Sequence, residues 1–180
     1  MHKAQKEFCL RVKVRFPDYF ANRCVVDVGS YNVNGDNRYL FDNCSYLGID
    51  LMPGPNVDRV GPVHELDLPD STFDVAVSTE CLEHDMHYGK TLETMVRVLK
   101  PGGLLLFTCA TEGRKPHGTR KKNPADSPGT VQQGGAWAEY YKNLSEADIR
   151  AAIEVDGLFA SYEFTVNPLL YDLYFWGIRR

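Results

Sequence analysis

The sequence predicts an α/β fold: an open, mostly parallel sheet of about seven strands, with helices on both faces and a C-terminal antiparallel hairpin. Short apolar runs, such as residues 23–28, 46–50 and 104–109, alternate with helical patterns, which is typical of βα units. Two later runs, residues 159–166 and 170–178, are separated only by a short turn, which indicates a hairpin. No linker or internal repeat divides the chain.

The composition indicates one globular domain over residues 1–180, long enough to bury a single sizeable core. A net charge of -4 gives no general attraction to nucleic acid. No apolar run approaches a membrane span, and none follows the first residues as in a signal peptide. We therefore expect a cytoplasmic protein that binds no nucleic acid and does not insert into a membrane, while its oligomeric state stays open.

The five cysteines do not predict a metal site or a disulfide framework. Their number is odd, and none belongs to a C-x-x-C pair. Cys9, Cys24 and Cys109 stand in apolar segments, where we expect them to be small buried side chains in a reducing compartment. No metal ligand is assigned from the sequence.

Residues 1–20 are expected to form an amphipathic helix that Pro17 ends. Four apolar residues recur at helical spacing: Phe8, Val12, Phe16 and Tyr19. The alternation over residues 10–16 also permits a strand, but a strand would leave Phe8 and Tyr19 without a role.

The first half of the sheet follows from three runs. Residues 23–28 are apolar on both faces, as in a parallel strand, and lead through a glycine turn to a short helical stretch at 38–41. Residues 46–50 form the second strand, which ends before the Pro-Gly-Pro turn at 53–55. Residues 58–66 are a weaker strand candidate.

The second half begins with a strand at residues 73–78. A helix at 85–100 follows, with one apolar stripe made of Leu92, Met95, Val96 and Leu99. Pro101-Gly102-Gly103 ends this helix before the strand at 104–109. Ser145 and Asp148 have capping-box spacing and predict a helix through about residue 155.

Residues 111–143 lack periodicity and are rich in Gly, Pro and basic residues. A loop of this length inside a compact domain is usually functional or mobile. We interpret it either as a mobile basic loop or as a substrate loop or lid over an anionic acceptor. Trp137, Tyr140 and Tyr141 could form an aromatic wall against a sugar or simply pack the loop onto the domain.

Two strand ends carry carboxylates that suit a nucleoside ligand. Asp27 lies two residues before Gly29, where it would repel a diphosphate but attract an ammonium group. Asp50 follows at the next strand end, where it can accept hydrogen bonds from two ribose hydroxyls. A dinucleotide would require G-x-G-x-x-G, and no glycine follows Gly29 until Gly35, so NAD or FAD is disfavoured.

The same segments resemble the motifs of class I S-adenosylmethionine-dependent methyltransferases of the type 11 kind. Val25-Val26-Asp27-Val28-Gly29-Ser30 resembles the first motif, Leu47-Gly48-Ile49-Asp50 the second, and His64-Glu65-Leu66-Asp67-Leu68-Pro69 the adenine-side motif. Residues 73–84 resemble the fourth-strand motif, and residues 97–104 the helix, turn and fifth strand after it. The resemblance implies a Rossmann-like sheet and S-adenosyl-L-methionine as cofactor.

The resemblance also implies roles for individual residues. Gly29 would let the backbone approach the cofactor, Asp50 would bind the ribose, and Asp67 would face the adenine amino group. Leu51 and Leu68 would be the adenine neighbours.

The methionine end of the cofactor is expected near Asp27, Ser30, Thr79 and Glu80. The family usually has more glycines after the first strand, whereas here Ser30, Tyr31 and Asn32 occupy the turn. Glu80 would point to the cofactor or acceptor, or it would simply stand at the start of a helix.

For an oxygen acceptor, a general base is needed, and His117 is the first candidate because the loop could bring it over the methyl group. His84 and Glu80 follow as catalytic candidates, although His84 also fits a structural hydrogen-bonding role.

The predicted reaction is methyl transfer to a small-molecule acceptor, anionic or carbohydrate. Residues 117–120 and 140–144 are similar to segments of small methyltransferases in surface-glycan pathways, which implies a sugar or glycan precursor. Cys81 follows Glu80 rather than proline, and no Asn-Pro-Pro-Tyr motif occurs, so methylation of nucleic-acid bases is disfavoured. Two alternatives remain: a non-catalytic S-adenosylmethionine-binding or regulatory module, and an NAD-dependent sugar-modifying enzyme.

Overall fold

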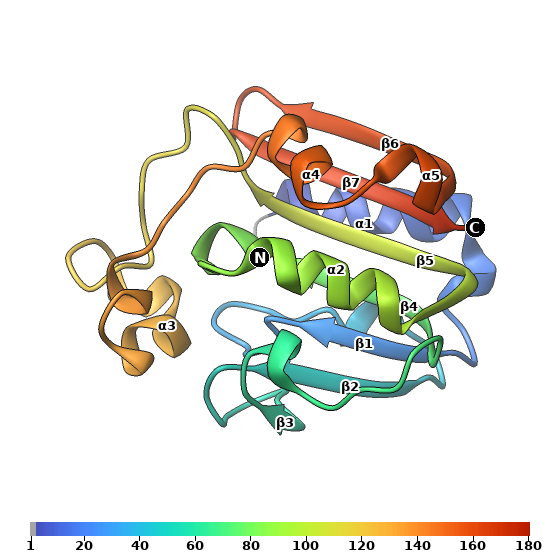
Figure 1. The fold of residues 1–180 in the computed structure, drawn as a ribbon, viewed down its shortest axis with the longest axis horizontal. Helices are drawn as coiled ribbons and strands as arrows, with labels where there is room; N and C mark the ends of the chain where they lie inside the picture. The colour runs from blue at the N-terminus through green and yellow to red at the C-terminus, as the bar shows by residue number, and fades with distance from the viewer. Residues whose placement is uncertain (1–2) are drawn as a thin grey trace.

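The computed structural model describes residues 3–180 and contains the predicted open sheet (Figure 1). Its strand order is β3-β2-β1-β4-β5-β7-β6. The first five strands pair in parallel, and β7 is antiparallel to both β5 and β6, so the mostly parallel sheet with its C-terminal hairpin is confirmed. The strands are β1 Cys24–Val28, β2 Ser45–Asp50, β3 Arg59–Val60, β4 Phe73–Thr79, β5 Leu99–Ala110, β6 Phe159–Asn167 and β7 Asp172–Arg179.

Helices cover both faces of the sheet, as predicted. Helix α1 lies behind the sheet in Figure 1, whereas α2, α4 and α5 lie in front of it. The α-helices are α1 Lys3–Arg15, α2 Tyr88–Val98, α3 Pro128–Gln133, α4 Glu146–Ala152 and α5 Val155–Leu158. Single 3-10 turns occur at Pro17–Tyr19, Arg38–Leu40, Val63–Glu65, Leu82–His84, Pro124–Asp126 and Trp137–Glu139.

Two apolar cores follow from the alternation of side chains along buried strands. In β1, Val25 packs with Phe8 and Val12 of α1, whereas Val26 faces the other way and packs with Leu92 and Met95 of α2. Both faces of β1 are thus covered by apolar side chains. Successive residues of this strand must therefore be apolar, which explains the continuous apolar run at this position.

Several helices and strands have boundaries that differ from those predicted from the sequence. The first helix ends at Arg15, and Pro17 starts a 3-10 turn instead; the predicted helix residues Met1 and His2 lie outside the described part of the chain. The helical stretch expected at 38–41 is one 3-10 turn. The strand expected over 58–66 is wrong beyond Val60, because Pro62 has no N–H to donate to a sheet ladder.

The predicted capping box is confirmed: the Ser145 hydroxyl accepts from the Asp148 N–H, and the Asp148 carboxylate accepts from the Ser145 N–H. The aperiodic segment 111–143 contains one short helix, α3, and two 3-10 turns, and it extends beyond the sheet edge in Figure 1. Among residues 3–180, no helix combines the length and apolar character needed to cross a membrane.

Candidate active site

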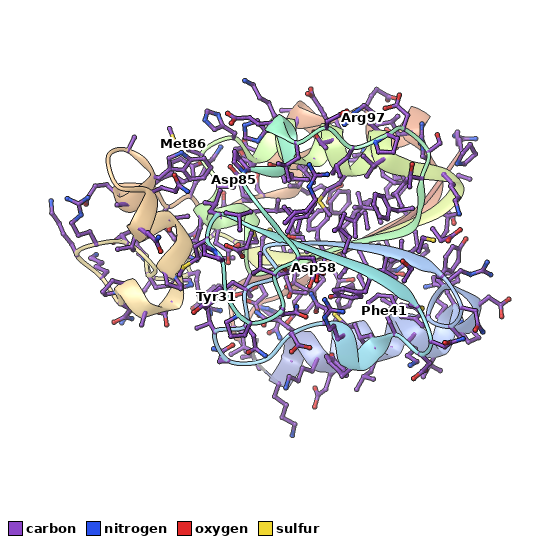
Figure 2. The ribbon with its side chains drawn as sticks, turned by 90° about the horizontal axis from the view of Figure 1, so that it is seen from below. Tyr31, Phe41, Asp58, Asp85, Met86 and Arg97 are labelled. Carbon is purple, nitrogen blue, oxygen red and sulfur yellow. The ribbon has the colours of Figure 1, made fainter. Side chains whose placement is uncertain are left out.

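A cavity of about 380 Å³ opens at the carboxyl ends of β1, β2 and β4. These parallel strands end at one edge of the sheet, next to the segment that carries α3. Tyr31 and Asp85 lie on this side of the molecule, whereas Phe41 and Arg97 lie toward the opposite end (Figure 2). The cavity brings together these predicted site residues: Asp27, Gly29, Ser30, Asp50, Leu51, Thr79, Glu80, His84 and His117.

Asp27 is held at the end of β1 by two donors. Its carboxylate accepts a hydrogen bond from the Tyr46 hydroxyl at 2.5 Å and another from the Asn37 amide at 3.0 Å. Asn37 also donates to the Thr79 hydroxyl at 3.1 Å, so it links the ends of β1 and β4. Burial raises the pKa of Asp27 to about 7, although both hydrogen bonds act to lower it. A cationic ligand in the cavity would favour the ionised form.

We expect Asp27→Asn to stabilise the ligand-free protein at pH 8. The folded chain keeps the Asp27 proton up to a pKa of about 7, whereas the ordinary value is 3.8, so the wild type loses stability as the pH rises between these values. The ionised, buried carboxylate costs up to about 4 kcal/mol at pH 8, and the uncharged amide avoids this cost.

Urea unfolding at pH 4 and pH 8 measures the effect. The difference in unfolding free energy between variant and wild type should grow with pH. A difference that is the same at both pH values would contradict the raised pKa.

Glycine and serine at the turn after β1 leave room for a ligand. Gly29 has a φ of +80°, and a Cβ there would lie 2.4 Å from the Cys81 sulfur, so only glycine fits. The Ser30 hydroxyl is buried and has no hydrogen-bond partner among the described residues. An unpartnered donor in a cavity wall suits a polar ligand.

Asp50 is fixed at the end of β2 by backbone amides. The N–H groups of Tyr31 and Leu51 donate to its two carboxylate oxygens at 3.0 and 2.7 Å. Gly129 lies directly over this carboxylate, because a Cβ on Gly129 would be 2.9 Å from the nearer oxygen. The Gln133 amide also donates to the Leu51 carbonyl, so the α3 segment forms the wall opposite β2.

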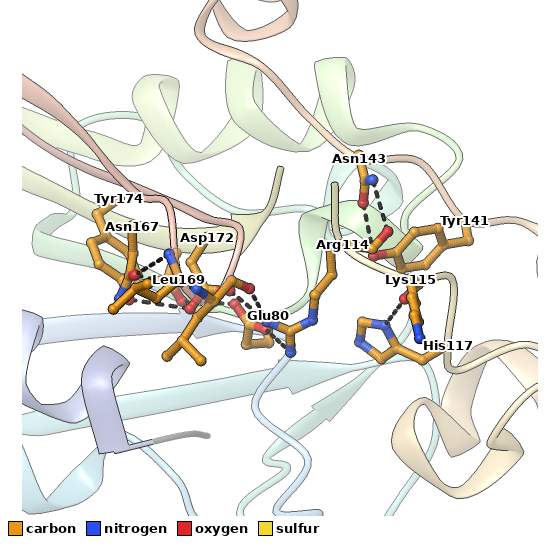
Figure 3. Close-up of polar contacts among 12 residues, drawn as sticks. Glu80, Arg114, Lys115, His117, Tyr141, Asn143, Asn167, Leu169, Asp172 and Tyr174 are labelled. Atoms are coloured by element: carbon orange, nitrogen blue, oxygen red, sulfur yellow. Dashed lines mark hydrogen bonds and ion pairs between the residues drawn. The ribbon is translucent and has the colours of Figure 1, made fainter. Parts of the chain in front are cut away.

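Glu80 follows β4 in a left-handed backbone conformation, with a φ of +53°. Arg114 ion-pairs with Glu80 at 3.8 Å and with the fully buried Asp172 at 2.8 Å (Figure 3). Burial, together with Asp172, raises the pKa of Glu80 to about 7, and Arg114 opposes this rise. Arg114 therefore connects the loop at residues 111–143, called the cavity loop below, to β7. It also neutralises buried carboxylates at the cavity wall.

His84 and His117 meet beside this ion pair. Their ring centroids are 5.0 Å apart, and both rings contact Tyr141. Burial lowers the pKa of His84 to about 3, with His117 and Arg114 adding to the effect, so His84 is poorly suited to act as a general base. His117 is half-buried and lines the cavity.

Asp67 and Leu68 are not brought to the cavity. Asp67 is exposed, and Leu68 packs in the core in front of the sheet. Gly61, Pro62 and Val63 line the cavity in their place, because the chain leaves β3 at Gly61. The cavity wall is therefore apolar at this point.

Many further cavity residues were not assigned from the sequence, among them Tyr31, Asn37 and Arg114. Arg114 stands in the basic run of the loop, but Asp172, its partner, lies 58 residues further along the chain. No local pattern pairs such distant residues. Trp137 lines the cavity, whereas Tyr140 does not.

Comparison with known proteins agrees with this geometry. Residues 27–107 match the methyltransferase domain family. Over these residues the chain is similar to class I S-adenosylmethionine-dependent methyltransferases. S-adenosylmethionine is the cofactor of this domain class, and the strand order and the position of the cavity agree with its fold.

Two curated proteins are similar to parts of this chain. The chain is 35% identical over 77 residues to phthiotriol/phenolphthiotriol dimycocerosates methyltransferase 1 of Mycobacterium ulcerans, which covers 36% of this chain and 28% of that protein. It is 33% identical over 112 residues to a probable S-adenosylmethionine-dependent methyltransferase of Mycolicibacterium smegmatis, which covers 53% of this chain and 44% of the relative. The chain thus spans less than half the length of these relatives.

The fold of the domain is also found among solved structures. A 1,6-didemethyltoxoflavin-N1-methyltransferase of Burkholderia thailandensis, solved with its acceptor and S-adenosylhomocysteine, superposes with a TM-score of 0.65 at 17% identity. The match covers 98% of this chain and 78% of that one. At this identity, the similarity establishes the fold alone.

Proposed function

We propose that the chain transfers the methyl group of S-adenosylmethionine to a small, polar acceptor, namely a sugar or glycan precursor that carries an anionic group. One observation supports this most: a single cavity joins the strand ends at Asp27 and Asp50 to loop residues Lys115 and His117. A cavity that runs from the strand ends to a loop carrying Lys115 and His117 offers a place for an acceptor beside the cofactor, which favours an enzyme over a non-catalytic binding module.

The residues at the strand ends fit this cofactor. Asp50 can accept from ribose hydroxyls, Asp27 can attract the ammonium group, and the Ser30 hydroxyl lacks a partner. When bound, S-adenosylmethionine supplies a methyl group on a sulfonium leaving group, so alignment provides most of the catalysis. The apolar wall at Pro62 and Val63 suits the adenine ring.

In this proposal, residues of the loop at 111–143 line the part of the cavity that receives the acceptor, called its acceptor half. Lys115 is exposed and lines the cavity, whereas the charge of Arg114 is paired with Asp172 and Glu80. Lys115 therefore remains to attract an anionic acceptor, and Trp137 offers an aromatic surface for a sugar ring. We propose that residues 111–143 serve as the substrate loop or lid.

A hydroxyl acceptor must lose a proton. His117 and Glu80 both line the cavity and are the candidates to accept it. The Nδ1 atom of His117 lies 3.1 Å from the Lys115 carbonyl, which can only accept, so in the neutral imidazole that donates to this carbonyl the proton acceptor is Nε2.

Calorimetric titration with S-adenosylhomocysteine tests the cofactor half. We expect Asp50→Ala to weaken binding by about 1 to 3 kcal/mol, because charged hydrogen bonds to the ribose are lost. Asp67→Ala is the matched control, since this exposed carboxylate lies outside the cavity and its loss should leave the affinity unchanged. Wild-type binding of NAD but not of S-adenosylhomocysteine would refute the proposal.

A radiolabelled methyl-transfer screen over sugars, glycan precursors and lipids tests the acceptor half. With an anionic acceptor in hand, Lys115→Ala should raise its KM and leave S-adenosylhomocysteine binding unchanged. Equal KM values for wild type and variant would remove Lys115 from acceptor binding.

A further inference from the structure

The strongest unexplained feature of the domain is a buried polar cluster beside the acceptor half of the cavity. Glu83 is fully buried, and its carboxylate oxygens lack a well-aligned hydrogen-bond partner among the described residues, with the backbone N–H groups of Glu83 and Ala110 as the donors that act on it. His84 is 4% exposed, and its Nδ1 atom also lacks a partner. Buried polar groups are nearly always paired, so the poor pairing of three atoms in neighbouring residues calls for an explanation.

The loop brings a third polar group to the same place. One ligand atom from each of Glu83, His84 and His117 lies within 4.8 Å of the other two. Gly118 makes this approach possible: it has a φ of +62°, and a Cβ there would lie 2.5 Å from the His84 ring. A residue other than glycine would push His117 away from His84.

The chemistry of the three groups is that of a metal site. We propose that Glu83, His84 and His117 bind one divalent transition-metal ion, such as Zn²⁺, beside the acceptor half of the cavity. One carboxylate and two imidazoles form a known catalytic ligand set, which leaves a further position for water or substrate.

The geometry of the cluster needs only a small contraction to hold the ion. Zinc binds nitrogen and oxygen at about 2.0 to 2.2 Å, so two ligands of a tetrahedral ion lie roughly 3.4 Å apart. The three ligand atoms now lie within 4.8 Å of one another, so side-chain shifts of about 1 Å would bring them to this spacing. His117 sits on a loop, which can supply most of the movement.

His117 is already oriented as metal-binding histidines are. Its Nδ1–H donates to the Lys115 carbonyl, which fixes the ring and leaves Nε2 as the ligand atom. Tyr141 contacts both imidazole rings and holds them side by side. The nearby cation, Arg114, is neutralised by Asp172 and Glu80, so it adds little repulsion toward an ion.

The role of the ion rests on the proposed methyl transfer, whereas its binding does not. Bound there, the ion would contact an acceptor oxygen at the cavity. His117 would then act as a ligand, and Glu80, which is outside the cluster, would remain as the side chain that can take a proton.

Calorimetric titration of the chelator-treated chain with Zn²⁺ tests the site, and Co²⁺ absorption in the visible range reports imidazole ligation. We expect the wild type to bind one equivalent. Glu83→Gln and His117→Ala should each weaken Zn²⁺ binding at least about tenfold, because each removes a ligand. The matched controls are Glu65→Gln and His87→Ala, which change the same residue types outside the cluster and should bind as the wild type does.

Absence of Zn²⁺ and Co²⁺ binding in the wild type would overturn the proposal, as would equal losses in the controls. Thermal unfolding identifies variants that do not fold; because Glu83 is buried, His117→Ala on the loop then decides the question. S-adenosylhomocysteine titration of the same samples separates the two proposals: a chain that binds this ligand but no metal refutes the metal site and leaves the proposed function standing.

Discussion

Replacing Arg114 by leucine is expected to lower the free energy of unfolding by about 3 to 5 kcal/mol, because a buried charge loses its counter-ion. Asp172 is fully buried and pairs with Arg114 at 2.8 Å, and Glu80 lies 3.8 Å from the same guanidinium. The Tyr174 hydroxyl also donates to Asp172, but it carries no charge to offset the carboxylate. The variant should also lose the anchor between the cavity loop and β7.

A double-mutant cycle separates the loss of pairing from the loss of packing. Combining Arg114→Leu with Asp172→Asn should recover part of the stability, because the buried Asp172 charge is then removed, whereas Glu80 still lacks its counter-ion. Arg120→Leu is the matched control: this loop arginine pairs with Glu139 at 3.7 Å, and both side chains are largely exposed, so its loss should cost at most about 1 kcal/mol. Similar costs for Arg114→Leu and Arg120→Leu in urea unfolding would contradict the assignment.

Gly29→Ala should strongly impair both folding and cofactor binding. The residue needs a φ of +80°, and the new Cβ would lie 2.4 Å from the Cys81 sulfur, so the turn after β1 must shift. Overpacking of this kind costs about 1 to 3 kcal/mol, and the left-handed conformation adds to it. Because this turn forms the cavity wall, we also expect weaker S-adenosylhomocysteine binding in calorimetry.

Gly102→Ala is the control for the conformational part of this cost. Gly102 has a nearly identical φ of +77°, but nothing lies within 4 Å of a Cβ placed there. Gly102 lies near the N-terminal end of β5, where the strand is exposed, and it does not line the cavity. The excess loss of stability in Gly29→Ala over Gly102→Ala measures the collision with Cys81, and no excess would mean that the turn relaxes freely.

The features predicted correctly from the sequence are those with a local cause. The capping box at Ser145 needs only a hydroxyl and a carboxylate three residues apart, and the apolar runs of buried strands identify themselves over five or six residues. The positions of Asp27 and Asp50 near the strand ends follow from the same local pattern, and both residues line the cavity at the carboxyl ends of the parallel strands.

The structure differs from the sequence-based expectations where tertiary contacts override the local pattern. Asp67 stands in an apparent motif, yet the chain leaves the sheet after Val60, and the cavity wall is made by Pro62 and Val63 instead. The turn at 38–41 is too short to be an α-helix, but its neighbour Asn37 holds Asp27, a contact that no periodicity indicates.

Short-range patterns of burial and turn formation specify the α/β class, the mostly parallel sheet with its hairpin, and the carboxylates at the ends of β1 and β2. Tertiary contacts instead determine which side chains meet the loop at residues 111–143. Arg114 meets Asp172, and His117 meets Glu83 and His84, across long stretches of chain. Such meetings depend on the path of an aperiodic loop and on the left-handed backbone at Gly118, neither of which a local pattern encodes.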